Sequence, residues 1–331
     1  MADNSQQSFL NALFQWTVKN TTAEATTATT TSDVEPMNDD KKQWLNDALE
    51  NLTVNPIERI KLCLSKIKDN QTSEEQKKEF LDELCHWSEE LDLAKDFFTL
   101  GGLEILSPLL EHKDDNIRIQ TCSLLATLVQ NNEHCQRIIV QSGLQQKLLQ
   151  IVSESNNPDL KTKAVTAISA LIRGYTLGQL QLQKYQGPKI LIQAISSPIP
   201  RLQNKLCFLI NTICSASAHM KKLFYENGAL VELIRLFNNE ACPDHHHTLQ
   251  TILTISSIKP NAMSTLVESN SSLIEEFQQK LNERYQDIQN SEDHVDEFNL
   301  INQIRTLLKS SSAENEQVPT TKKDQQIVAT S

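Results

Sequence analysis

The sequence predicts an all-α protein made of repeated helical units, and two observations support this prediction. Gly102, Gly143, Gly187 and Gly228 open successive units of similar pattern, at spacings of 41, 44 and 41 residues. Each unit also holds a long segment with apolar residues at positions i, i+3, i+4, i+7 and i+8, which is the period of a helix buried along one side. A period in the forties without a strand pattern is the signature of an armadillo or HEAT solenoid.

Three helices per unit favour the armadillo type over the HEAT type. In the first unit a short apolar helix over residues 103–110 precedes the long helix, and a third helix follows over residues 134–141. No unit can bury its apolar stripe alone, so neighbouring units must stack and both ends must be capped. We therefore expect a right-handed superhelical armadillo solenoid with helical caps. The stripes predicted to be buried are Thr121, Leu124, Leu125, Leu128 and Val129; Ala164, Ala167, Ile168, Leu171 and Ile172; and Leu206, Leu209, Ile210, Ile213 and Cys214.

The chain is expected to contain one repeat domain over residues 37–309 and two flexible tails. Residues 21–36 are rich in threonine and alanine without apolar periodicity, which is typical of a flexible linker. Residues 73–102 resemble an incomplete repeat that caps the first full unit, and segments 273–288 and 295–308 are expected to close the array. Residues 310–331 are polar and are predicted to be disordered. The glycines that open the units are expected to let the chain turn sharply.

Charge and hydropathy exclude several classes of function. The chain has 331 residues and a net charge of −11, whereas nucleic-acid binding requires a basic stripe that releases phosphate counterions. No segment approaches the roughly 20 apolar residues that a membrane span requires, and residues 1–9 do not read as a signal peptide. We expect a monomeric protein of the cytosol, or also of the nucleus, that binds neither nucleic acid nor membranes.

Catalytic and metal-binding motifs are largely missing. The glycines form neither a GxGxxG nor a GxxxxGK[ST] phosphate loop, and no GxSxG or HExxH motif occurs. Cys242 with His245, His246 and His247 is the one cluster of metal-ligand residue types. Adjacent histidines on a helix point about 100° apart, so a solvated helix start is favoured over a metal site. We expect no catalytic residue, no cofactor and no metal.

The binding surface is expected on the free faces of the long helices, which line the concave groove of an armadillo array. Lys163, Arg173 and Lys205 place cations on two adjacent helices of an acidic protein, with Phe208 beside them. Solvated cations without a partner are a common alternative for any single lysine, but their alignment on one face favours partner binding. The residues of the free faces are Gln120, Ser123, Thr127 and Gln130; Lys163, Thr166, Ala170 and Arg173; Lys205, Phe208, Thr212 and Ser215; and Thr248, Thr251, Ile255 and Ile258.

An armadillo adaptor that binds an extended peptide is the alternative function. Armadillo proteins of that kind share a ladder of asparagines in the groove, which clamps the peptide backbone. The corresponding positions here are Thr127, Ala170, Thr212 and Ile255. The missing asparagines argue against the adaptor.

Several segments resemble the armadillo-type nucleotide exchange factors of the seventy-kilodalton heat-shock chaperones, especially the metazoan cytosolic branch and its yeast counterpart. The resemblance rests on MNDDKKQWLNDALENL, EELDLAKDF, LLATLVQNN, DLKTKAVTAISALIRG and LFQWTVKN, and it extends from Leu10 to about Leu308. It implies that the concave face embraces lobe II of the chaperone's ATPase domain, which promotes the release of ADP and then of substrate. The positions that match the family's contacts are Asp92, Ala94, Lys163, Arg173, Lys205 and Phe208.

The resemblance also gives a role to the N-terminal segment LNALFQWTVKN. In this family a flexible N-terminal segment mimics substrate and helps to clear polypeptide from the chaperone. The alternative is that these residues form a short helix that caps the array. The apolar residues of the segment are Phe9, Leu10, Leu13, Phe14 and Trp16.

Overall fold

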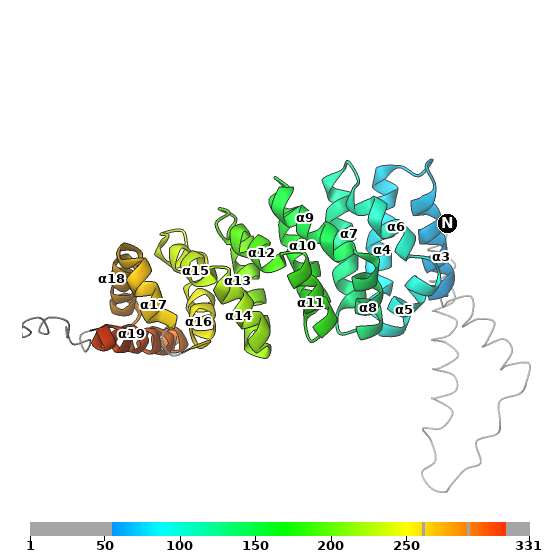
Figure 1. Cartoon of the computed structure of the whole chain (residues 1–331). Helices are drawn as coiled ribbons and strands as arrows, with labels where there is room; N and C mark the ends of the chain where they lie inside the picture. Colours follow the sequence, from blue (N-terminus) through cyan, green and yellow to red (C-terminus); the bar gives the residue numbers. More distant parts are fainter. Residues whose placement is uncertain (1–54, 260–261, 290–291, 316–331) are drawn as a thin grey trace, which may run out of the picture. The chain divides into compact units, whose positions relative to one another are not determined.

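The computed structural model describes residues 55–259, 262–289 and 292–315. The chain divides into two units between Arg59 and Ile60, and nearly all described residues lie in the second. Every regular element in the described ranges is helical, and the all-α prediction is confirmed (Figure 1). None of these helices is both long and apolar enough for a membrane span.

Four groups of three helices follow one another along the chain, as the repeat pattern predicts. The first contains α6 (Leu103–Leu110), α7 (Asp115–Val129) and α8 (Glu133–Ser142). The second contains α9 (Leu144–Glu154), α10 (Pro158–Ile172) and α11 (Thr176–Lys184). The third contains α12 (Gly187–Ile195), α13 (Pro200–Ala216) and α14 (Ala218–Glu226), and the fourth contains α15 (Ala229–Asn238), α16 (His245–Ser256) and α17 (Ala262–Ser269).

Additional helices flank the four repeats. Before them lie α3 (Pro56–Lys68), α4 (Glu74–Trp87) and α5 (Leu91–Thr99), and after them α18 (Ser271–Ile288), the 3-10 turn η1 (Glu292–His294) and α19 (Val295–Asn315). The closing helices are therefore present as predicted. However, α19 continues to Asn315, so the expected end of the repeat domain at residue 309 falls inside a helix. The predicted boundary at residue 37 and residues 316–331 lie outside the described residues.

Local sequence signals explain where the helices begin. Ser73 and Gln76 form a capping box at the start of α4, in which each side chain accepts a hydrogen bond from the other residue's backbone amide. Asn157 caps α10 by accepting hydrogen bonds from two backbone amides, and Pro158 occupies the first helical position, where it costs no hydrogen bond. The polar turns before the long helices therefore act as start signals.

The long helices pack against one another in chain order, and their apolar stripes form the core. Helices α4, α7, α10, α13 and α16 form this series, which we call the long-helix row, and α19 packs on its last member. All fifteen stripe residues predicted in α7, α10 and α13 are buried. Periodicity therefore gave the correct inward side of each of these three helices.

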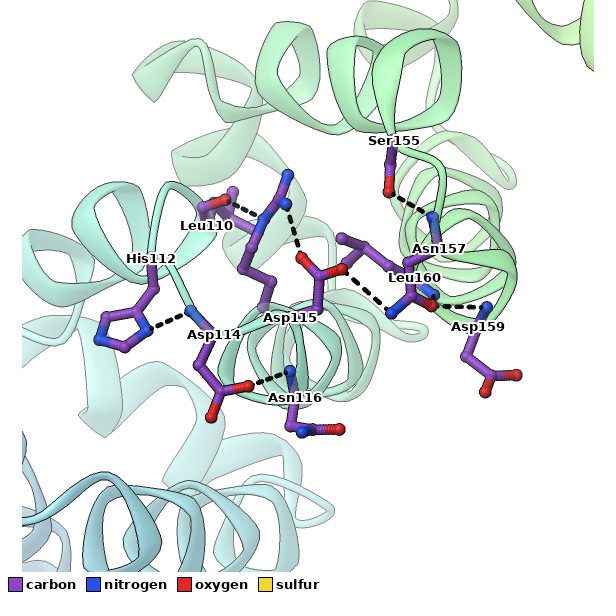
Figure 2. A network of polar contacts seen from close by, with 10 residues as sticks. Leu110, His112, Asp114, Asp115, Asn116, Ser155, Asn157, Asp159 and Leu160 are labelled. Atoms are coloured by element: carbon purple, nitrogen blue, oxygen red, sulfur yellow. Dashed lines mark hydrogen bonds and ion pairs between the residues drawn. The ribbon is translucent and has the colours of Figure 1, made fainter.

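Polar side chains at the helix starts also connect the first and second repeats (Figure 2). The Asn157 side chain donates to Asp115 Oδ2 at 3.0 Å, and Asp115 Oδ1 accepts from Arg118 at 2.8 Å. Arg118 Nε in turn donates to the Leu110 carbonyl at 3.0 Å. Because these hydrogen bonds join side chains at the starts of α7 and α10 to one another, we interpret the network as a junction between repeats rather than as a binding site.

The predicted turns at the opening glycines are confirmed at two positions and wrong at two. Gly143 and Gly228 have φ of 78° and 86°, a left-handed conformation that favours glycine. Gly102 instead has φ −64°, and the left-handed residue there is Gly101, with φ 84°. Gly187 is the first residue of helix α12.

Close packing explains the glycines at positions 102 and 187. A Cβ atom on Gly102 would lie 2.4 Å from the ring of Phe97, and one on Gly187 would lie 2.3 Å from the side chain of Leu182. Both distances are far below van der Waals contact, so any side chain there would displace buried neighbours. These glycines let helices approach closely rather than letting the chain turn.

Candidate functional site

The free sides of α7, α10 and α13 form one accessible surface, which we call the row face. Lys163 and Arg173 of α10 and Lys205 of α13 are exposed, and Phe208 is 42% exposed although it is a large apolar residue. None of the twelve residues predicted for this face is buried. They are Gln120, Ser123, Thr127, Gln130, Lys163, Thr166, Ala170, Arg173, Lys205, Phe208, Thr212 and Ser215.

A hollow of about 140 Å³ lies in the row face where α7, α10 and α13 meet. Arg173 and Lys205 line it together with Phe208, and the guanidinium carbon of Arg173 lies 5.5 Å from the centre of the Phe208 ring. This cation–π contact places the guanidinium group on an aromatic surface, and its Nη2 donates to the Ser169 hydroxyl at 3.5 Å. Arg173 and Phe208 therefore form one contiguous exposed patch.

The cations of the row face lack an intramolecular counter-ion in the described part of the chain. No acidic side chain there lies within ion-pair distance of Lys163, Arg173 or Lys205. By contrast, Lys78 pairs with Asp114 and Lys68 with Glu104, both across repeats. Exposed, unpaired cations on neighbouring helices suit an acidic partner surface.

Sequence reasoning did not identify Asn131 as part of the site. It follows α7 with φ 55°, a left-handed conformation that asparagine adopts more readily than most residues, and it lines the hollow beside Gln130. An asparagine directly after a predicted helix end was the available signal. The two amides add neutral donors and acceptors to a cationic hollow.

The structure does not bring the two predicted residues of α5 into this hollow. Ala94 is only 1% exposed, so the prediction of Ala94 as a contact residue is wrong: its side chain packs in the core. Asp92 is exposed and pairs with Lys95 at 2.8 Å, a contact whose hydrogen bond lowers the pKa of the Asp92 carboxyl. Both residues came from the family resemblance, and neither belongs to the long-helix row.

Three predicted polar residues of the row face already have hydrogen-bond partners. The Gln120 amide donates to Asp82 of α4 at 3.1 Å. The hydroxyl groups of Thr127 and Thr212 donate to carbonyls one turn earlier in their own helices, at 3.2 and 2.8 Å. These residues shape the surface, whereas its unpaired charge comes from the lysines and Arg173.

The face predicted for the fourth repeat is displaced by one residue. Thr248, Thr251 and Ile255 are all buried, and the Thr251 hydroxyl donates to the Cys207 carbonyl of α13 at 3.1 Å. The partly exposed residues with the same spacing are His247, Gln250 and Thr254. The turn before α16, residues 239–244, is longer than the turns before α7, α10 and α13, and the weaker apolar pattern of α16 gave the wrong side of this helix.

No group of metal ligands occurs among the described residues. In the cluster that includes Cys242, burial is the largest cause that raises the pKa of the thiol, and burial, together with the charge of Arg284, lowers the pKa of His245. The His245 ring packs edge-on against Phe237 at 5.3 Å between centroids. His245 therefore packs in a helix junction, and the three histidines have different neighbours.

Similarity to solved structures identifies the fold. The model superposes on a crystal structure of an engineered protein with a TM-score of 0.61 and 18% identity, over 78% of this chain and 98% of the other. A designed armadillo repeat protein gives a TM-score of 0.58 and 14% identity, over 76% of this chain and 99% of that one. The armadillo-type all-α solenoid is thereby confirmed.

Curated relatives match a large part of the chain in sequence. Hsp70-binding protein 1 of Homo sapiens is 25% identical over 295 residues, which are 85% of this chain and 81% of the relative. The Hsp70 nucleotide exchange factor FES1 of Saccharomyces cerevisiae is 27% identical over 218 residues, or 63% of this chain and 71% of the relative.

Two family models match adjoining parts of the sequence. The model described as nucleotide exchange factor Fes1 matches residues 10–97, and the model described as the SIL1/FES1/HPBP1 C-terminal domain matches residues 93–198. Together they extend from the predicted N-terminal segment through the second repeat, which includes Lys163 and Arg173. Over residues 10–198 the chain is therefore similar to the Fes1-type nucleotide exchange factors.

Proposed function

We propose that this protein is a nucleotide exchange factor of an Hsp70 chaperone and that its row face binds lobe II of the chaperone's ATPase domain. The similarity to named nucleotide exchange factors supports the exchange function. The observation that supports the location is a set of cations at α10 and α13 that have no acidic ion-pair partner among the described residues, with the exposed Phe208 in contact with Arg173. A large aromatic residue flanked by cations is typical of the centre of a protein interface.

The mechanism requires binding energy and no bond chemistry. A partner shifts a conformational equilibrium only by as much as it binds one state better than the other. If the row face fits the ATPase domain in its ADP-releasing conformation, docking stabilises that conformation and ADP leaves. ATP then rebinds and substrate is released. In this proposal the protein is not an enzyme and uses no cofactor.

The peptide-binding adaptor remains less favoured. Thr127 and Thr212 occupy ladder positions and use their hydroxyl groups within their own helices. In the corrected register Thr254 takes the fourth position, and it donates to Asn211 at 2.7 Å. None of these side chains offers the paired amide donor and acceptor that an asparagine presents to a peptide backbone.

The substrate-mimic segment, with Phe9, Leu10, Leu13, Phe14 and Trp16, lies outside the described residues and stays a prediction. A flexible linker of about twenty residues spans on the order of 25 Å and raises the local concentration of a tethered ligand to about millimolar. Such a segment needs only weak affinity to compete with substrate. Localisation in the cytosol or nucleus and a monomeric state are likewise part of this proposal.

Calorimetric titration tests the partner assignment. We expect the full-length protein to bind the isolated ADP-loaded ATPase domain with one-to-one stoichiometry and to give no heat with the isolated substrate-binding domain whose cleft is filled by a tightly bound peptide. Sedimentation of the mixture should show one copy of each chain, which also tests the monomer proposal. No binding to the ATPase domain, with capture of an extended peptide instead, would favour the adaptor.

A further inference from the structure

His247 is held in place by the residue that caps helix α16. The Asp244 side chain accepts a hydrogen bond from the His247 backbone amide at 2.9 Å, and its other oxygen lies 2.7 Å from Nδ1 of the same histidine. This second contact places the Nδ1 proton toward Asp244. The ring is thereby oriented while 42% of the side chain remains exposed.

The exposed ring adjoins the aromatic centre of the row face. The centroids of His247 and Phe208 are 6.4 Å apart, and Arg173 lies on Phe208 at 5.5 Å. Arg173, Phe208 and His247 thus form a sequence of contacts from α10 through α13 to α16. Thr248 and Thr251 are buried and add nothing to this surface. His247, in the first turn of α16, is partly exposed and extends the surface into the fourth repeat.

Asp244 is the carboxyl group in direct contact with the ring of His247. Partial burial raises the pKa of Asp244, but the hydrogen bonds from His247 outweigh this effect, so the pKa of the carboxyl lies below its ordinary value. Asp244 is therefore an anion that stabilises a cationic ring.

Other titratable groups near α16 have different partners. The ring of His246 is 5.5 Å from that of His247, between centroids, and lies on the same turn. From α18 and α19, Arg284 and Glu297 form a bidentate pair at 2.7 and 2.9 Å, and their charges act on His245. On α13, Cys207 contacts the Thr248 hydroxyl, and the charge of Asp244 is a minor cause among those that raise the pKa of its thiol, of which burial is the largest.

We propose that His247 extends the partner surface into the fourth repeat by donating through Nε2 to a carboxylate of the docked partner, and that it takes up a proton on binding. This inference rests on the proposed function, because the docked ATPase domain supplies the carboxylate. The incoming carboxylate adds to the attraction that Asp244 exerts on a cationic ring. A histidine is suited to this step since its charge ordinarily changes between about pH 5 and 8.

The test measures protons as well as affinity. The full-length protein is titrated with the ATPase domain at pH 7.5 in phosphate and in Tris, two buffers that differ in ionisation enthalpy, so that the difference in heat gives the protons taken up. We expect uptake of a substantial fraction of one proton by the wild type. His247→Gln should abolish this uptake and weaken binding by about three- to tenfold, the effect of one charge-assisted hydrogen bond.

Two further variants separate this role from folding and from unrelated histidines. His134→Gln is the matched control, because His134 is an exposed histidine on α8 outside the long-helix row; it should keep both the proton uptake and the affinity. Asp244→Asn retains a good helix cap but removes the anion, so we expect it to reduce proton uptake while thermal stability changes little.

The outcomes distinguish this inference from the function on which it rests. If the wild type binds the ATPase domain and His247→Gln shows the same proton uptake and affinity, the role of His247 is refuted and the proposed function stands. If His134→Gln loses uptake equally, the proton belongs elsewhere and the inference fails. If the wild type does not bind at all, both the function and the inference fail.

Discussion

Arg173→Glu combined with Lys205→Glu is expected to weaken binding of the ATPase domain by more than about a hundredfold. Both cations line the hollow. Neither forms an ion pair with an acidic side chain among the described residues, so both can bind carboxylates of the chaperone. Reversing a charge at such a contact replaces attraction by repulsion, which costs several kcal/mol in an interface. Isothermal titration measures the loss.

The fold should survive this substitution because exposed charges contribute little to stability. The matched control is Lys184→Glu with Lys189→Glu, which makes the same change in net charge on α11 and α12, away from the long-helix row. The control is expected to bind within a few fold of the wild type. Equal affinity of the hollow variant and the wild type would remove Arg173 and Lys205 from the interface.

Ile168→Ala is expected to lower the free energy of unfolding by about 2 to 5 kcal/mol. Ile168 is fully buried on α10, in the middle of the long-helix row, and truncation there leaves a cavity that the neighbouring repeats fill only in part. Urea denaturation followed by circular dichroism measures the change.

Thr166→Ala, on the same helix, is the control for this core substitution. Thr166 lies at the hollow, and its hydroxyl bonds only to the Thr162 carbonyl of the preceding turn. We expect a change of less than about 1 kcal/mol, as for most surface substitutions. A similar loss of unfolding free energy in the two variants would mean that α10 does not bury the side on which Ile168 lies.

The sequence predicts the fold well where burial repeats with the helical period. Leu125 and Ile168 belong to stripes that the structure buries, because a long helix has only one way to turn such a stripe inward. The free face predicted for α16 was wrong by one residue. A longer turn precedes this helix, and the apolar period alone does not show where the helix begins. Gly102 and Gly187 were misread because their close neighbours belong to other helices.

The candidate site was predictable as a surface but not as a hollow. The free face of α10 follows from its stripe, so Lys163 and Arg173 could be placed on it. The contact of Arg173 with Phe208 depends on how α10 and α13 pack, which a single helix does not encode. Ala94 came from the resemblance alone, and local sequence gave no warning that its side chain is buried.

Release of labelled ADP from the chaperone, followed by stopped flow, tests the central claim most directly. Catalytic amounts of the full-length protein should accelerate release in proportion to its concentration, without any hydrolysis of ATP by the protein alone. The Arg173→Glu and Lys205→Glu double variant should leave release close to the unassisted rate, while the Lys184→Glu and Lys189→Glu control should retain acceleration. Release at the unassisted rate over a full titration of wild-type protein would contradict the account.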